Sequence, residues 1–163
     1  MRTILHAALC IGFAAGPSLL LAGSTDPEPV RWTTSATQTP VRAGQTINVV
    51  LHADIQAGWH LYALNEPDGG PHATDIGIAQ GDIPDLLSAS ENPPVERYDT
   101  VMARRLRFHL DHADFKLQLS IPADTPAGPH TVHLLTRFQA CSDKLCLPPR
   151  TRSITTVLSV RAV

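Results

Sequence analysis

The chain has 163 residues, of which 43% are hydrophobic and 17% are charged. This length fits one domain with one core, and the composition excludes a disordered chain. The formal net charge is −2 and no block of like charge occurs, so nothing in the charge pattern points to nucleic-acid binding.

The first 24 residues have the pattern of a secretory signal. Arg2 gives a basic tip, an apolar stretch follows, and Ala22-Gly23-Ser24 offers the small residues that signal peptidase requires. A transmembrane anchor is the alternative, but Gly16 and Pro17 interrupt the apolar run and no basic stop-transfer cluster follows. We therefore expect a signal peptide over residues 1–24, a mature domain over residues 25–163, and no membrane span after cleavage.

Period-two alternation of apolar and polar residues recurs along the mature chain and predicts β-strands. One predicted face carries Ile47, Val49, Leu51 and Ala53, and another carries Phe115, Leu117, Leu119 and Ile121. The expected strands cover residues 30–35, 46–53, 59–64, 74–79, 86–90, 104–110, 115–121, 131–138 and 153–160.

Turn residues separate these runs, and 14 prolines discourage edge-to-edge pairing of exposed strands. No long amphipathic helix is evident. Short strands at regular intervals are typical of an immunoglobulin-like antiparallel β-sandwich, which is the all-β fold that we expect. That fold alone indicates no activity.

The segment from Phe138 to Pro149 holds Cys141 and Cys146, the two cysteines that remain if signal cleavage removes Cys10. In an oxidising compartment such a pair forms a disulfide. A ring this small adds only about 2 kcal/mol in the chain-entropy estimate, so a chemical role competes with that of a structural staple. Thiol-disulfide exchange needs an accessible thiolate and a second thiol nearby, and this spacing supplies both.

Three segments resemble the periplasmic N-terminal domain of the thiol:disulfide interchange protein DsbD. They are Ile55-Gln56-Ala57-Gly58-Trp59-His60-Leu61-Tyr62, the pair of strands within residues 106–121, and Phe138-Gln139-Ala140-Cys141 with Cys146-Leu147-Pro148-Pro149. This family has an immunoglobulin-like fold and one redox-active cysteine pair. The resemblance implies that reduced Cys141 and Cys146 pass two electrons to a partner, with Cys146 holding the partner and Cys141 resolving the mixed disulfide.

The resemblance also implies a short cap loop with acidic and aromatic residues over the cysteines. Its nearest match is the segment from Val95 to Thr100, which makes Glu96 and Tyr98 candidates for a lid or a proton acceptor. Tyr62 and Trp59 are candidates for shielding the sulfurs from water. The alternative for the aromatic residues is an ordinary place in the core, and for Glu96 a solvated surface.

The implied partners are thioredoxin-fold proteins of the periplasm and a membrane electron donor in trans. The best-known family member continues into a membrane domain and a thioredoxin-like domain, whereas this chain stops at Val163. We therefore expect a free-standing, monomeric, periplasmic protein-disulfide reductase component with no cofactor. Cytochrome c biogenesis is one process that such a redox couple serves.

Two other functions compete with thiol-disulfide exchange. A non-catalytic secreted β-sandwich with a permanent disulfide would bind a partner without exchanging electrons. A metal site at His109 and His112, or at His130 and His133, is disfavoured because strand residues three apart point to opposite faces. No Ser-His-Asp order or phosphate loop supports hydrolase chemistry.

Overall fold

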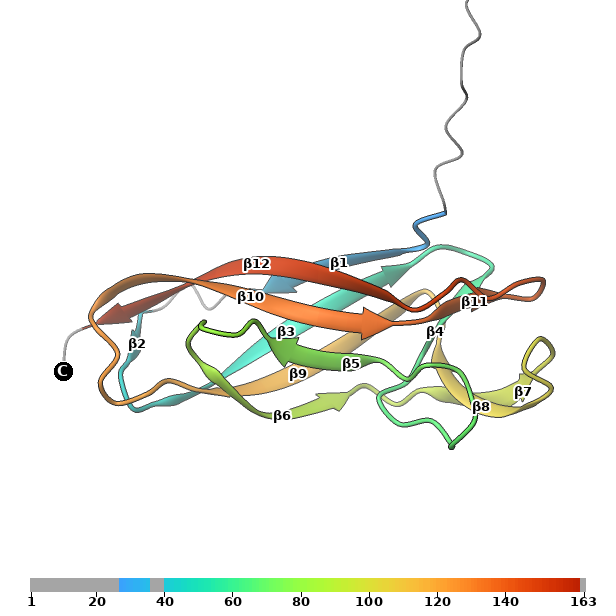
Figure 1. Ribbon diagram of the computed structural model, residues 1–163, viewed down its shortest axis with the longest axis horizontal. Coiled ribbons are helices and arrows are strands. Elements are labelled where there is room, and N and C mark those ends of the chain that lie inside the picture. Colours follow the sequence, from blue (N-terminus) through green and yellow to red (C-terminus); the bar gives the residue numbers. More distant parts are fainter. Residues whose placement is uncertain (1–26, 36–39, 162–163) are drawn as a thin grey trace, which may run out of the picture.

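The computed structural model describes residues 27–35 and 40–161, which form twelve strands in three four-stranded sheets and no helix (Figure 1). The expected signal peptide lies outside these residues. The first sheet has the order β1 (Val30–Ser35), β3 (Thr46–Ile55), β9 (His112–Ser120), β6 (Asp85–Glu91). The second has the order β2 (Val41–Arg42), β12 (Arg150–Arg161), β10 (Gly128–Phe138), β5 (Asp75–Ile78). The third has the order β11 (Ala140–Ser142), β4 (Trp59–Tyr62), β8 (Arg104–His109), β7 (Val95–Asp99).

The first two sheets enclose the main hydrophobic core, and the prediction of an immunoglobulin-like β-sandwich is confirmed. Antiparallel pairing of β3 with β9 sets Leu51 opposite Phe115 and Val49 opposite Leu117. These side chains are fully or almost fully buried because alternation places them all on one face. The second sheet contributes Val132, Leu134, Phe138, Leu158 and Val160 to the same core.

Each of the nine expected strands corresponds to a strand of the structure, with shifts at the ends. Three further strands, β2, β7 and β11, were not predicted. Two of them are only two and three residues long, and β7 shows no apolar alternation. The residues expected to form a cap loop are therefore mostly the edge strand β7, because they pair in register with β8 from Val95 to Asp99.

The third sheet lies at one end of the sandwich and is built from continuations of its strands (Figure 1). A turn at Gly58, whose φ of 82° favours glycine, leads from β3 into β4. The turn at Leu110 and Asp111 joins β8 to β9, and Gln139 alone separates β10 from β11. The sandwich layers therefore fix the position of this smaller sheet, which carries both cysteines.

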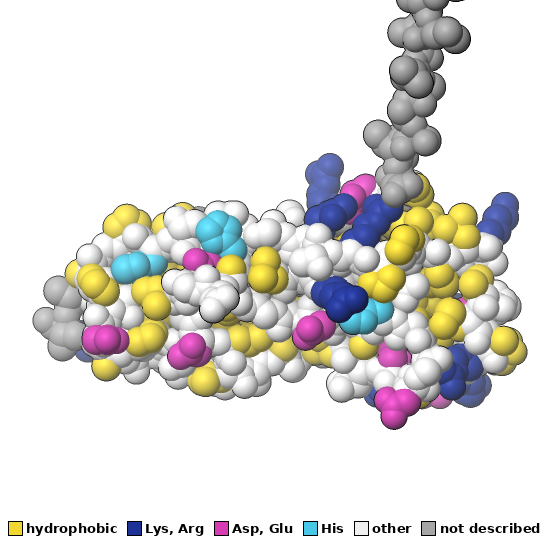
Figure 2. Space-filling model, viewed as in Figure 1, with side chains coloured by type: hydrophobic (Ala, Val, Ile, Leu, Met, Phe, Trp, Pro, Cys, Tyr) yellow, Lys and Arg dark blue, Asp and Glu magenta, His cyan; other side chains and the backbone are white. Residues whose placement is uncertain are grey.

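Lys and Arg side chains gather on the half of the molecule that carries the third sheet, on the face shown in Figure 2. The opposite half of that face carries few of them. The described part of the chain contains no helix with the length and hydrophobicity needed to cross a bilayer.

The packing at Phe115 generates a stability prediction. Phe115 is fully buried against Trp32 and opposite Leu51, so Phe115→Ala should lower the free energy of unfolding by about 3–5 kcal/mol in a urea titration. Leu87→Ala, at a side chain that is 55% exposed, is the control and should change it by less than about 0.5 kcal/mol. Equal losses in the two variants would contradict the proposed core.

Candidate functional site

Cys141 and Cys146 form a disulfide with an S–S distance of 2.00 Å. Cys141 lies in β11, where it pairs with His60 of β4, and Cys146 lies on the returning arm of the same hairpin. The pairing of Cys141 and Cys146 expected from the sequence is therefore present.

The cysteine hairpin is held by hydrogen bonds that do not involve sulfur. The Gln139 side-chain amide donates to the carbonyl of Leu147 at 3.0 Å and accepts the amide of His72 at 2.8 Å. Leu147 N–H also donates to the carbonyl of Ala140. At the tip, the Ser142 amide donates to the Leu145 carbonyl at 2.8 Å. These bonds fix both arms of the hairpin independently of the disulfide.

The two sulfurs differ in their access to solvent. Cys141 is fully buried in a small apolar cluster with Tyr62, Leu106 and Phe108. Cys146 is only partly buried at the edge of this cluster, and Pro148 and Pro149 beyond it are exposed. An incoming protein can therefore reach Cys146 more readily than Cys141.

A buried polar cluster lies beneath Cys146. The Tyr62 hydroxyl is 4.0 Å from Cys146 Sγ and donates a hydrogen bond of 2.7 Å to Asp99 Oδ2. His60 Nε2 lies 3.0 Å from the same carboxylate oxygen and 3.2 Å from the Tyr62 hydroxyl. Asp99 Oδ1 accepts the backbone amides of Val101 and Met102 at 2.9 and 2.8 Å. Both carboxylate oxygens are therefore satisfied, as burial of a charge requires.

The surroundings of this cluster fix its protonation states near neutral pH. Burial alone would raise the pKa of Asp99, but hydrogen bonds from the Met102 amide and the Tyr62 hydroxyl, together with His60, hold this pKa below its ordinary value. Burial lowers the pKa of His60 below 6.5, against the opposing effect of Asp99. Burial and the hydrogen bond to Asp99 raise the pKa of Tyr62. The cluster is thus an ionised carboxylate, a neutral imidazole and a neutral phenol.

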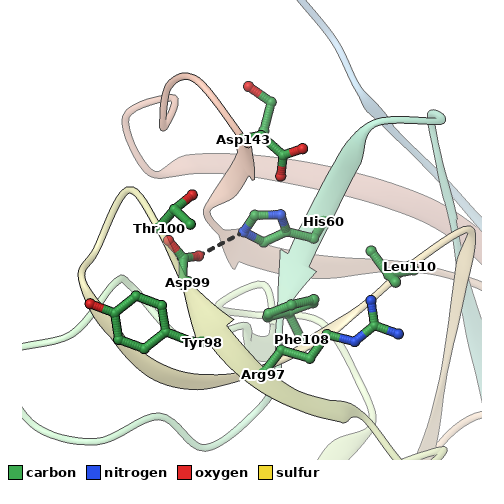
Figure 3. Close-up of a pocket in the computed structure, with 9 residues that line it drawn as sticks. His60, Arg97, Tyr98, Asp99, Thr100, Phe108, Leu110 and Asp143 are labelled. Carbon is green, nitrogen blue, oxygen red and sulfur yellow. Dashed lines mark hydrogen bonds and ion pairs between the residues drawn. The ribbon is translucent and has the colours of Figure 1, made fainter.

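A cavity of about 210 Å³ opens beside the cysteine hairpin (Figure 3). His60 and Phe108 lie side by side in it, with ring centroids 4.5 Å apart. Arg97 and Tyr98 line it from β7, and Asp143 lines it from the loop between the two cysteines. The cavity therefore lies between β7 and the loop that joins the two cysteines.

The structure brings only part of the predicted set of supporting residues to the sulfurs. Tyr62 lies against Cys146. Tyr98 is 60% exposed and lines the cavity. Trp59 lies on the other face of β4 from Tyr62 and packs against the main core. Glu96 is exposed and pairs with Arg105 at 3.1 Å on the surface.

Sequence reasoning did not single out His60 and Asp99 as site residues. His60 stands two residues before Tyr62, so strand periodicity places both side chains on one face of β4. That signal was available in the sequence. Asp99 ends a strand that lacks alternation, and its contact with His60 depends on pairing between distant segments, which no local pattern indicates.

Two of the four histidines that are candidate metal ligands pair with carboxylates. His109 is buried with Glu91 at 2.9 Å, and His133 lies 2.8 Å from Asp82. Within residues 27–35 and 40–161, no three His, Cys, Asp or Glu side chains are grouped so as to hold a metal ion.

Comparisons with known proteins identify the family of this chain. The family model "Thiol:disulfide interchange protein DsbD, N-terminal" matches residues 30–158. The N-terminal periplasmic domain of ScsB from Proteus mirabilis is 16% identical, with a TM-score of 0.52, over 77% of this chain and 44% of that chain. The DsbD N-terminal domain of Neisseria meningitidis in the reduced form is 17% identical, with a TM-score of 0.46, over 74% and 82%. A search of curated proteins gave no match.

The fold and the disulfide place the chain in the class of thiol-disulfide exchange domains. The family match covers most of its length. The chain belongs to the family of DsbD N-terminal domains.

Asp99 generates a prediction about stability and pH. Asp99→Asn removes the charge that four donors surround, and should lower the free energy of unfolding at neutral pH by about 1–3 kcal/mol. Because folding lowers the pKa of Asp99, this contribution is fully present above the unfolded value of about 3.9 and is lost as pH falls through the folded value.

Urea unfolding at neutral pH and below about pH 4 measures this difference, which should shrink in acid. The exposed Asp124 provides the matched control, since Asp124→Asn should have little effect at either pH. Equal stability of wild type and Asp99→Asn at neutral pH would contradict the role of the charge.

Proposed function

We propose that this protein passes reducing equivalents through Cys141 and Cys146 to a thioredoxin-fold partner in the periplasm. The observation that carries the proposal is the unequal exposure of the two sulfurs within a hairpin held by other bonds. A partly exposed thiol supports attack on an outside disulfide, and a buried thiol at bonding distance supports resolution.

The reaction begins with the reduced protein. The Cys146 thiolate attacks one sulfur of the partner's disulfide, forms a mixed disulfide and releases the other partner sulfur as a thiolate, which takes up a proton. The Cys141 thiolate then attacks Cys146 Sγ and releases the second partner sulfur, which is protonated in turn. Two electrons and two protons pass to the partner, and the Cys141–Cys146 disulfide is formed.

Tyr62 contributes by its position rather than as a base. Its raised pKa keeps the hydroxyl protonated, and the proton is donated to Asp99. The Tyr62 oxygen therefore presents lone pairs to Cys146 Sγ, which favours the neutral thiol over the thiolate. This arrangement supports a cysteine that is protected until a partner engages it.

The periplasmic location rests on family membership and on the signal pattern of residues 1–24. The electrons would come from a membrane electron donor. Reduction of a thioredoxin-fold protein that serves cytochrome c biogenesis is one use of the couple. The protein would work as a monomer without a cofactor.

Trapping the mixed disulfide tests the role of each cysteine. Cys141→Ala removes the resolving thiol, so incubation of this variant with oxidised periplasmic extract should give an adduct through Cys146 that dithiothreitol releases. Non-reducing electrophoresis and mass spectrometry measure the adduct and identify the partner. Cys146→Ala is the control and should give at least about tenfold less adduct, since Cys141 is buried.

Adducts of equal yield from the two variants would contradict the assignment of Cys146 as the attacking thiol. If Cys141→Ala gives no thioredoxin-fold adduct in repeated trapping, the exchange function itself is wrong.

The reduction potential distinguishes an electron carrier from a structural staple. We expect the Cys141–Cys146 couple to equilibrate with glutathione or thioredoxin buffers at a potential above about −300 mV, because structural disulfides typically lie below that value. Quantified alkylation of the equilibrated protein measures the potential. A bridge that stays oxidised in every such buffer would favour the non-catalytic binding sandwich.

A further inference from the structure

The Tyr62 hydroxyl lies between two acceptors. Asp99 Oδ2 is 2.7 Å away on one side, and Cys146 Sγ is 4.0 Å away on the other. A hydroxyl has one proton to donate, so it serves one acceptor at a time. In the oxidised protein it donates to Asp99. Any change that weakens the hydrogen bond from Tyr62 to Asp99 therefore makes the hydroxyl available to donate to a Cys146 thiolate.

His60 competes with Tyr62 for the same oxygen of Asp99. Asp99 Oδ1 is occupied by the amides of Val101 and Met102, which leaves Oδ2 to accept from both Tyr62 and His60. With a proton on Nε2, neutral His60 donates a hydrogen bond to this ionised oxygen. Protonated His60 donates a hydrogen bond in which both partners are charged, so it binds the oxygen more strongly and neutralises the carboxylate.

The groups that face the imidazole come from every element around it. Tyr62 shares its strand, Asp99 and Arg97 come from β7, and Phe108 of β8 stacks on the ring. Asp143, in the loop between the cysteines, lies above the ring on the side away from Asp99 (Figure 3). Two carboxylates therefore flank the imidazole, and the Arg97 guanidinium lines the same cavity.

We propose that His60 is a positioning residue that controls the reactivity of Cys146. When His60 gains a second proton, it becomes the main hydrogen-bond donor to Asp99 Oδ2, and the Tyr62 hydroxyl can then donate its proton to Cys146 Sγ. The use of this control rests on the exchange function proposed above. The chemical step is the ionisation of Cys146, in which the thiol proton passes to water and Tyr62 keeps its own proton.

The direction of the effect follows from charge. Beside neutral His60, the ionised Asp99 and the Tyr62 lone pairs oppose a thiolate on Cys146. Beside protonated His60, the imidazolium charge and the freed hydroxyl both favour the thiolate. The change lies on the acid side of pH 6.5, because burial lowers the pKa of His60 below that value.

The alkylation rate of Cys146 tests this proposal without any partner protein. The reduced protein is treated briefly with iodoacetamide between about pH 4.5 and 8, and trypsin cleaves after Lys144 to separate the two cysteines for mass spectrometry. A lone thiol reacts about tenfold more slowly for each pH unit below its pKa. This relation is a straight line of log rate against pH, called here the tenfold line and extrapolated from the rates measured at about pH 8. On the acid side, wild-type Cys146 should react about tenfold faster than the tenfold line predicts, because its thiol pKa is lowered by about one unit there.

Two substitutions separate position from charge. His60→Gln retains an amide donor for Asp99 but gains no proton, and His60→Phe retains only the stacking on Phe108. Both variants should follow the tenfold line throughout. His109→Gln is the matched control, because His109 is another buried histidine with a carboxylate partner, Glu91, and it should keep the wild-type departure.

A wild-type rate that follows the tenfold line throughout overturns the proposal, and this result needs no variant to fold. A His60→Gln protein that keeps the departure from the line also overturns it. Failure of the exchange function would appear instead in the trapping experiment, because alkylation of Cys146 does not depend on a partner.

Discussion

The redox chemistry depends on a hairpin whose shape is set by the amide of Gln139. This side chain connects the Leu147 carbonyl to the His72 amide and so joins the outer arm of the hairpin to a separate loop. Because neither bond involves sulfur, the Cys141–Cys146 bond can open without releasing the backbone that carries it. The glutamine of the Phe-Gln-Ala-Cys motif thus has a structural explanation.

The buried cluster of Asp99, Tyr62 and His60 beneath Cys146 carries a desolvation penalty that opposes folding. An ionised carboxylate is kept away from water there, which is tolerated only when its oxygens are paired. The turn after β7 supplies two of the donors through the amides of Val101 and Met102. Tyr62 and His60 supply the others from β4. The same interactions hold the β7–β8 hairpin against the cysteine end of the molecule and place the Tyr62 hydroxyl beside Cys146.

Strand alternation predicted the sandwich because each long strand buries one face, as at Leu51 and Phe115. The cysteine pair and its contact with Tyr62 were also predictable, through the motif and the family resemblance. Asp99 was not, since its role arises from the pairing of β7 with β8 and from the approach of β4, which are long-range events. Trp59 shows the opposite limit: the same motif carries Tyr62 to the sulfur, but strand parity turns Trp59 toward the main core.

Pro148 and Pro149 limit the contacts that another molecule can make with the edge of the third sheet. β11 and the returning arm form an outer edge of the third sheet, and an exposed edge ordinarily recruits a further strand through its free amides. Pro148 and Pro149 have no N–H to offer, so strand addition is blocked next to the disulfide. Beside the disulfide, this edge therefore offers another molecule side chains and carbonyl groups, but no backbone amide from either proline.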